Sequence, residues 1–218
     1  MPSKETALQT IVDQGLLPLF FYEDAEVSLQ IVKTLYKAGV RTLEYTNRGP
    51  AALENFRYLK SELRGHADLH LGIGTIKTVA EAEAFISAGA DYIVAPIVDP
   101  AVGDHVHEAG LLWIPGCFTP TEIHRAQQAG AGLVKVFPAN IVGPAFISSV
   151  KELFPGQPLM PTGGVEIDAH NIASWFRAGV CAVGMGSKLI SKEVLAGRQY
   201  EALHELTLKA LELVKESK

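Results

Sequence analysis

The stretch AGVRTLEYT, residues 38–46, joins the end of a helix-like segment to an apolar run through the pair Ala38-Gly39. The same Ala-Gly pair stands before an apolar run at residues 88–89, 109–110, 129–130 and 178–179. Glycine suits this position because the residue that closes a helix often has a positive φ, which strains residues with a side chain. The repeat therefore predicts a regular alternation of helices and strands.

Glycines at equivalent places extend this alternation along the whole chain, at positions 15, 39, 65, 89, 110, 130, 156 and 179. Successive glycines are separated by about one strand, one helix and two short loops. The apolar runs after them have strand length and cover residues 16–21, 40–46, 67–74, 91–96, 111–116, 132–138, 157–161 and 180–186. Amphipathic, helix-like segments cover residues 26–38, 51–63, 78–88, 100–109, 119–129, 143–154, 168–178 and 193–217.

These alternating β/α units predict the α/β class and a (β/α)8 TIM barrel, since consecutive parallel strands need crossover helices and eight of them can close a sheet. An open doubly wound sheet is the alternative architecture. No composition break or Pro/Gly/Ser-rich linker divides the chain, so we assign residues 1–218 to a single domain. Residues 3–14 are expected to form an N-terminal helix that caps the bottom of the barrel.

The composition excludes several classes of protein. Of the 218 residues, 48% are hydrophobic and 20% are charged, which is too apolar for a disordered chain. The net charge of -5 argues against a nucleic-acid binder. The start of the chain has no signal-peptide core, and apolar stretches such as residues 15–22 are too short to span a membrane. We therefore expect a cytoplasmic protein that acts on small molecules, without a nucleic-acid or membrane partner.

The cysteines and histidines form no recognisable metal-binding or disulfide pattern. Cys117 and Cys181 are isolated from each other and lack CxxC spacing. His105 and His107 are two residues apart in a helical segment, where they face different sides. GxGxxG, Walker A and nucleophile-elbow motifs are absent from the sequence. We expect neither a metal nor another cofactor.

One lysine stands inside an apolar strand segment, Lys135 in LVKVF, residues 133–137. Strand alternation puts Leu133 and Phe137 on the face of Lys135, and Val134 and Val136 on the other face. If the valines pack against helices, Lys135 points into the barrel. Burial favours the neutral amine, which can attack a ketone to form a Schiff base. The alternative is a structural lysine that pairs with a buried carboxylate.

The second strand segment supplies a complementary set of polar groups. Thr42, Glu44, Thr46 and Arg48 share one parity, so a carboxylate and a guanidinium are expected at the barrel mouth. Glu44 is a candidate proton shuttle, and Arg48 can bind a substrate carboxylate through two hydrogen bonds. A purely structural Glu44–Arg48 ion pair is the alternative.

Two glycine-rich loops follow the last two strand segments, PTGGV at residues 161–165 and GMGSK at residues 184–188. Loops at these places in a TIM barrel often bind phosphate, because glycines let backbone N–H groups approach the oxygens. The alternative is that the glycines serve only as tight turns.

Five segments, in this order, resemble the 2-keto-3-deoxy-6-phosphogluconate (KDPG) / 4-hydroxy-2-oxoglutarate (KHG) aldolase family. They are GVRTLEYTNR (39–48), GIGT (72–75), PGCFT (115–119), GAGLVKVFPANIVG (130–143) and PTGG (161–164). The resemblance implies a metal-free class I aldolase that cleaves a 2-keto-4-hydroxy acid to pyruvate and an aldehyde, and a homotrimeric assembly. The substrate implied first is KDPG, which yields glyceraldehyde 3-phosphate.

The resemblance also implies roles for individual residues. Lys135 forms the Schiff base with the 2-keto acid, and Glu44 moves protons through water. The substrate-binding residues are Arg48 and Thr75 for the carboxylate, Phe137 near the pyruvyl carbons, Thr162 and Pro96 elsewhere in the site, and Gly163, Gly164, Gly186 and Ser187 for the phosphate.

The chain departs from the family pattern at Tyr45 and Asn47, so the resemblance does not fix which aldehyde the enzyme releases. 2-Keto-3-deoxy-6-phosphogalactonate and 4-hydroxy-2-oxoglutarate are alternative substrates. A phosphate-binding barrel isomerase or epimerase, or a sugar-phosphate binding barrel without catalysis, is an alternative of another class. Neither of these accounts for Lys135.

Overall fold

Each of the predicted apolar runs forms a strand in the computed structural model, which describes residues 2–218. All strand pairs are parallel. The strands are β1 Leu16–Phe20, β2 Thr42–Thr46, β3 His70–Gly74, β4 Tyr92–Val94, β5 Leu112–Ile114, β6 Gly116–Cys117, β7 Val134–Val136, β8 Leu159–Pro161 and β9 Val183–Met185.

The strands form a closed barrel in which the ladder of strand pairing is interrupted at two places. One run of pairing has the order β5-β4-β3-β2-β1-β9, and the other has the order β6-β7-β8. Pro115 separates β5 from β6, so these two strands are consecutive parts of one predicted strand. A bridge between Thr162 and Gly184 joins the edge after β8 to β9. The predicted (β/α)8 barrel is confirmed.

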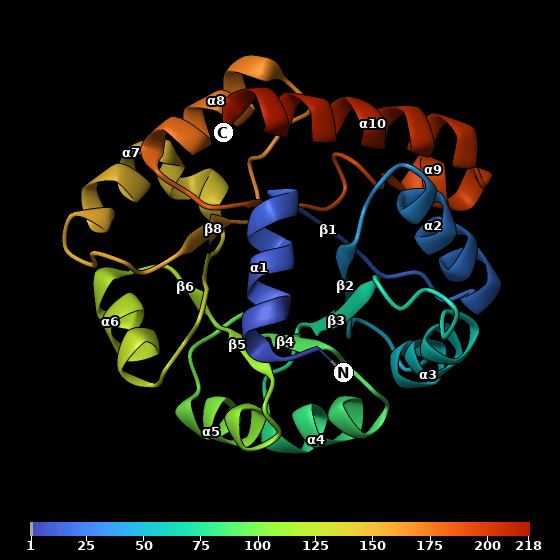
Figure 1. Ribbon diagram of the computed structural model, residues 1–218, viewed down its shortest axis with the longest axis horizontal. Coiled ribbons are helices and arrows are strands. Elements are labelled where there is room, and N and C mark those ends of the chain that lie inside the picture. The colour runs from blue at the N-terminus through green and yellow to red at the C-terminus, as the bar shows by residue number, and fades with distance from the viewer. Residues whose placement is uncertain (1) are drawn as a thin grey trace.

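Helices surround the barrel, as the view along its axis shows (Figure 1). Those of the β/α units are α2 Ala25–Lys37, α3 Ala52–Glu62, α4 Val79–Ser87, α5 Pro100–Glu108, α6 Pro120–Gln128, α7 Ala139–Lys151, α8 Ala169–Ala178 and, after β9, α9 Lys192–Gly197 and α10 Tyr200–Ser217. The last helix, α10, packs between α8 and α2 and so completes the outer ring.

Two helical segments differ from the sequence prediction. The helix predicted at 143–154 begins earlier, at Ala139. It is kinked at Gly143, which has a φ of 69° and directly precedes Pro144. A residue before proline avoids the helical region, and glycine tolerates the positive φ. The segment predicted as one helix at 193–217 is split into α9 and α10, because Arg198 has a left-handed φ of 49°.

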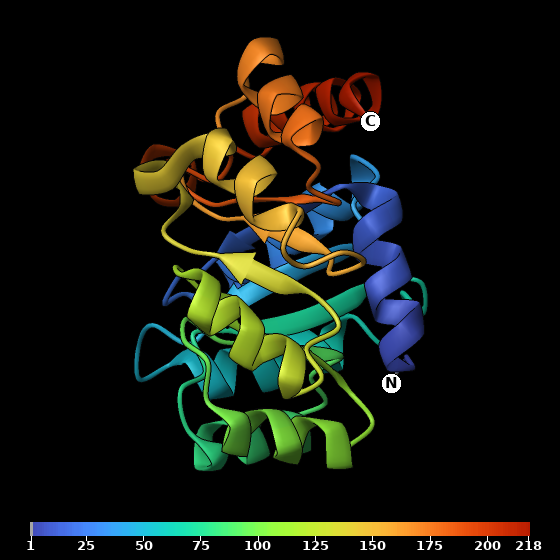
Figure 2. The same cartoon turned by 90° about the vertical axis from the view of Figure 1, so that its left-hand side faces the viewer.

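The first helix, α1 Lys4–Gln14, closes the N-terminal end of the barrel (Figures 1 and 2). Ala7 and Ile11 are fully buried and pack into the barrel interior. Gln14 completes the closure, because its side-chain amide donates to the Thr42 carbonyl at 2.8 Å and accepts from the Arg41 N–H at 2.5 Å. The expected capping helix is confirmed, and the open end of the barrel is the one where the strands finish.

The core consists of two apolar clusters separated by the strands. The inner cluster fills the barrel and includes Leu133 and Met160, while the outer cluster lies between strands and helices and includes Val134 and Val136. The predicted alternation of β7 is therefore correct.

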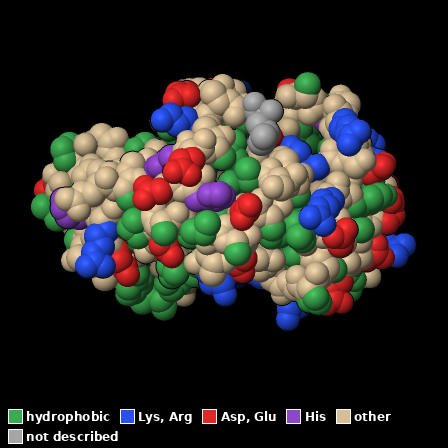
Figure 3. Space-filling model, turned by 90° about the horizontal axis from the view of Figure 1, so that it is seen from below, with side chains coloured by type: hydrophobic (Ala, Val, Ile, Leu, Met, Phe, Trp, Pro, Cys, Tyr) green, Lys and Arg blue, Asp and Glu red, His purple; other side chains and the backbone are tan. Residues whose placement is uncertain are grey.

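On the face shown in Figure 3, acidic and basic side chains are interspersed. Within residues 2–218, no helix has the length and apolar character needed to cross a bilayer.

Candidate active site

Lys135 and Glu44 meet inside the barrel, although they come from strands on different parts of its wall. The Lys135 Nζ lies 3.6 Å from Glu44 Oε2, and the two side chains are 8% and 1% exposed. Lys135 also lies over the Phe137 ring, with Nζ 5.3 Å from the centroid. The pair places an amine that can act as a nucleophile next to a group that can accept or donate a proton.

The space for the Glu44 carboxylate comes from a glycine on the neighbouring strand. A Cβ at Gly74 would overlap Glu44 Oε1. Glu44 Oε2 makes no hydrogen bond, and the hydroxyls of Thr46 and Thr162 are also buried without a partner. Buried polar atoms are usually satisfied, so such a group of free acceptors and hydroxyls inside one barrel is typical of a site that receives a polar ligand.

A cavity of about 370 Å³ opens at the C-terminal ends of β1, β7, β8 and β9. Of the predicted substrate-binding residues, the structure brings together in its lining Arg48, Phe137, Thr162, Gly163, Gly164, Gly186 and Ser187. Lys135 and Glu44 do not line this cavity, but Phe137, whose ring lies under the Lys135 Nζ, does. The cavity therefore joins both glycine loops and reaches the ring over which the Lys135 amine lies.

The glycine loop after β8 is held tightly against the start of α7. Gly163 and Gly164 have φ values of 93° and 76°, and a Cβ on Gly164 would lie 2.9 Å from Asn140 Cα. Asn171, at the start of α8, donates to the Gly164 carbonyl at 3.1 Å and accepts from the Glu166 N–H at 3.0 Å. These glycines are therefore required by the turn itself as well as being open to the cavity.

The loop after β9 forms a turn that is closed by two backbone hydrogen bonds. Leu189 and Ile190 both donate to the Gly186 carbonyl at 2.9 Å. The leading amides of such a turn have no partner within it and are suited to an anion. Lys188 pairs with Glu166 at 2.9 Å and so ties this loop to the one after β8.

Three predicted site residues occupy the rim of the barrel in different ways. Arg48 is exposed and makes no ion pair with Glu44, so the structural Glu44–Arg48 pair is absent from the described residues. Thr75, just after β3, has a left-handed φ of 67°, a strained conformation that clusters at functional sites. Thr75 and Pro96 do not line the cavity, since they follow β3 and β4.

Comparison with known proteins gives the chain its family. The sequence model for KDPG and KHG aldolase matches residues 9–206, which is most of the chain. The chain belongs to the KDPG and KHG aldolase family. It is therefore a member of a class I aldolase family, whose enzymes are lyases.

Individual members of the family are similar over nearly the full length. A 2-dehydro-3-deoxy-phosphogluconate aldolase of Treponema pallidum is 31% identical and covers 96% of this chain and 98% of its own. A probable 2-dehydro-3-deoxy-6-phosphogalactonate aldolase of Rhizobium meliloti is 32% identical, covering 90% and 88%. The crystal structure of a 4-hydroxy-2-oxoglutarate/2-dehydro-3-deoxyphosphogluconate aldolase from TTHB1 has a TM-score of 0.82 at 30% identity and covers 95% and 98%.

Several residues that line the cavity of this aldolase are not among the site residues predicted from the sequence, Phe21 and Lys192 among them. Phe21 directly follows β1, and Lys192 is the first residue of α9. The apolar run LLPLFF at 16–21 contained a usable signal, because an aromatic residue at the very end of a barrel strand lies at the active-site face. Lys192 gave no such signal, since it stands at the start of a helix rather than at the end of a strand.

The thiols of the aldolase are placed for packing. Burial raises the pKa of Cys117 to about 12 and that of Cys181 to about 11. Both thiols therefore stay protonated at neutral pH and are weak nucleophiles. Among residues 2–218, His, Cys, Asp and Glu side chains form no group that could hold a metal ion.

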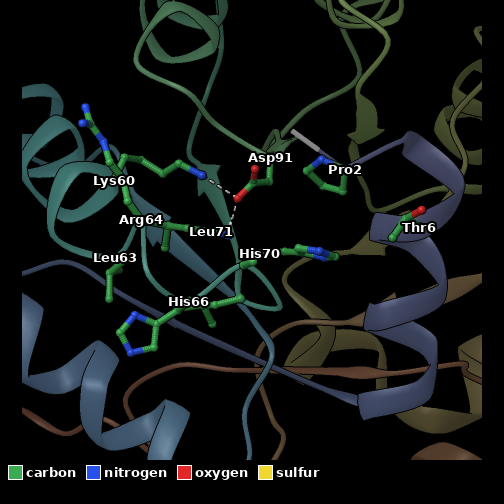
Figure 4. A pocket seen from close by; sticks show the side chains of 11 residues that line it. Pro2, Thr6, Lys60, Leu63, Arg64, His66, His70, Leu71 and Asp91 are labelled. Atoms are coloured by element: carbon green, nitrogen blue, oxygen red, sulfur yellow. Dashed lines mark hydrogen bonds and ion pairs between the residues drawn. The ribbon is translucent and has the colours of Figure 1, made fainter.

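A second cavity, of about 480 Å³, lies at the N-terminal end of the aldolase barrel (Figure 4). Its wall carries another lysine–carboxylate pair, Lys60 and Asp91, with Nζ 2.7 Å from Oδ2. Asp91 also accepts from the buried Leu71 N–H at 2.7 Å. This cavity is larger than the one over Lys135, but its buried carboxylate is already satisfied by hydrogen bonds.

Proposed function

We propose that this protein is a Schiff-base aldolase that cleaves KDPG to pyruvate and glyceraldehyde 3-phosphate. The observation that carries the proposal is the buried Lys135 amine, 3.6 Å from Glu44, below a cavity lined by both glycine loops. A general phosphate-binding barrel has no need for an interior lysine, whereas carbon–carbon cleavage by an iminium requires one.

In the proposed reaction, Lys135 attacks the C2 carbonyl of the substrate, and loss of water gives an iminium. Glu44, through a water molecule, removes the proton of the C4 hydroxyl while the C3–C4 bond breaks, so the aldehyde leaves and the electron pair moves into an enamine. The same carboxyl returns a proton to C3. Water then hydrolyses the iminium, which releases pyruvate and restores the free amine.

The remaining site residues would bind the two ends of the substrate. Arg48 and Thr75 would hold the carboxylate, with Phe137, Thr162 and Pro96 around the pyruvyl carbons. The amides of the two glycine loops would hold the phosphate, as expected for Gly163, Gly164, Gly186 and Ser187. The cationic Lys188 and Lys192 at the same cavity favour a phosphorylated aldehyde over a neutral one.

2-Keto-3-deoxy-6-phosphogalactonate is the second candidate substrate, because the Rhizobium meliloti relative carries that specificity in its name. It differs from KDPG only in configuration at C4, and both have the phosphate. Unphosphorylated 4-hydroxy-2-oxoglutarate would leave the glycine loops without a partner. We also propose, from the family resemblance, that residues 1–218 act as one domain in a cytoplasmic homotrimer.

Borohydride trapping tests the proposed chemistry. Pyruvate with borohydride should inactivate the enzyme and add one reduced pyruvyl group at Lys135, because only an iminium is trapped in this way. Peptide mass mapping locates the adduct. An adduct on another lysine, or equal inactivation without pyruvate, would contradict the proposal.

Gly186→Ala tests the phosphate site without a large disturbance of the fold. Gly186 has no positive φ, and a Cβ there meets its nearest neighbour, Leu19 Cδ1, at 3.4 Å. The added methyl should obstruct the phosphate and lower kcat/KM for KDPG by about tenfold, or about 1.4 kcal/mol. Cleavage of 4-hydroxy-2-oxoglutarate should change much less. Equal losses of kcat/KM on both substrates would mean that the loop is a structural turn and does not bind the phosphate.

A further inference from the structure

Phe21 forms a wall of the active-site cavity and is held from two sides. Its ring lies 5.6 Å from the Tyr45 ring, centroid to centroid. On the other side, the backbone of Gly49 approaches so closely that a Cβ there would lie 2.8 Å from Phe21 Cζ. Phe21 is thus fixed between β2 and the loop that carries Arg48, which lines the same cavity.

The backbone directly after Phe21 is bound by a buried polar cluster on the outside of the barrel, made of Ser28, Tyr45 and Asn55. The Tyr45 hydroxyl donates to the Tyr22 carbonyl at 2.8 Å and accepts from Asn55 Nδ2 at 3.1 Å. The Ser28 hydroxyl donates to the same carbonyl at 3.2 Å. Ser28 and Tyr45 are 0% exposed and Asn55 is 6% exposed, so water does not compete for these hydrogen bonds.

The cluster connects three elements of the barrel to one short loop. Ser28 belongs to α2, Tyr45 to β2 and Asn55 to α3. Asn55 Nδ2 also contacts the next carbonyl of the loop, that of Glu23, at 2.9 Å. A loop tied at two successive carbonyls to three rigid elements has little freedom, and Phe21 stands immediately before those carbonyls. Tyr45 is also one of the two positions, with Asn47, at which the sequence departs from the family pattern.

We infer that the Ser28–Tyr45–Asn55 cluster positions Phe21 as a rigid wall on the aldehyde side of the cavity and so restricts the enzyme to slender, unbranched aldehydes. The inference rests on the proposed function. Phe21 is the specificity-determining residue, and Tyr45 and Asn55 are positioning residues that do not touch the substrate. A fixed ring excludes an aldehyde with a bulky substituent, whereas a mobile ring can move aside for it.

Aldol synthesis from pyruvate tests the inference with two aldehydes, glyceraldehyde 3-phosphate and benzaldehyde. Phe21→Ala should raise the ratio of kcat/KM for benzaldehyde to that for glyceraldehyde 3-phosphate by at least about tenfold. Tyr45→Phe keeps the ring but removes the hydroxyl, and should shift the ratio in the same direction by about threefold, mainly through KM for the aldehydes. Tyr58→Phe is the matched control, since its hydroxyl bonds Glu26 on the exposed surface.

Exchange of the pyruvate methyl protons with deuterated water, followed by NMR, separates this inference from the proposed function. That exchange needs the Schiff base and a proton shuttle but no aldehyde. It should proceed at nearly the wild-type rate in Tyr45→Phe, whose side chain does not touch the substrate. Absence of exchange in the wild type would reject the proposed function. Normal exchange with an unchanged aldehyde ratio in both Phe21→Ala and Tyr45→Phe would reject the positioning of Phe21 while leaving the aldolase chemistry intact.

Discussion

Two lysine–carboxylate pairs lie at opposite ends of the same barrel, and they are built differently. At the N-terminal end, Lys60 and Asp91 are 2.7 Å apart, and Asp91 also binds a backbone N–H (Figure 4). At the C-terminal end, where the proposed active site lies, Lys135 and Glu44 are 3.6 Å apart, and Glu44 Oε2 has no hydrogen bond. Lys60 is also 26% exposed, whereas Lys135 is 8% exposed, so the two pairs differ both in burial and in the hydrogen-bond partners of the carboxylate.

Removal of each lysine gives the largest expected contrast between the two pairs. Lys135→Gln should lower kcat/KM by at least about 1000-fold, because the covalent route through the iminium is lost. Lys60→Gln should lower kcat/KM by no more than a few-fold and should mainly reduce the melting temperature. Steady-state pyruvate release measures both. Comparable losses of activity in both variants would contradict the distinction.

Removal of the Glu44 carboxyl should have the next largest effect on activity. Glu44→Gln keeps the side-chain volume but cannot shuttle a proton, so kcat should fall by about 100-fold or more. The far-UV circular dichroism and the urea midpoint serve as controls for folding. If kcat stayed within a few-fold of wild type while the midpoint fell, Glu44 would be a structural partner of Lys135.

The carboxyl at the N-terminal end should matter for stability instead. Asp91→Ala leaves the buried Leu71 N–H without its acceptor and Lys60 without its partner, and should reduce the free energy of unfolding by about 1–3 kcal/mol. Urea denaturation with an unchanged m-value measures the loss. Asp68→Ala, at an exposed ion pair with Arg41, should cost less. An undiminished stability of Asp91→Ala would show that this pair is not structural.

The smallest expected effect concerns the pH dependence of stability at the N-terminal end. Burial lowers the pKa of His70, which lines the cavity beside Asp91. Below about pH 6.5 the unfolded chain therefore binds a proton that the folded chain does not, and stability falls as the pH decreases. His70→Gln should make the free energy of unfolding less dependent on pH between about 5 and 7. Urea titrations at several pH values measure this, and an identical slope in both proteins would contradict it.

Part of the site could be predicted because strand alternation is a local property. Alternation alone indicated that Lys135 shares a face with Leu133, and the structure places that face inside the barrel. The same rule placed Glu44 inward and Tyr45 outward. It could not indicate that Gly74 leaves room for the Glu44 carboxylate, since the contact depends on how two strands are aligned side by side.

Local signals were weaker where the chain leaves regular structure. The helix predicted at 143–154 begins at Ala139, and the break at Arg198 divides the predicted last helix. A left-handed non-glycine residue such as Arg198 has no reliable sequence signature, because a single φ outside the helical region is imposed by the packing around it.

The sequence by itself determined the alternation of strands and helices, the barrel, the interior position of Lys135 and the two glycine loops. Each of these depends on periodicity or on glycine conformations within a few residues of one another. Only the tertiary structure decided the 3.6 Å approach of Lys135 to Glu44, the fixed position of Phe21 and the closure of the N-terminal end by Gln14. These are contacts between segments remote in sequence, and their distances exist only after the parallel strands have closed into a ring.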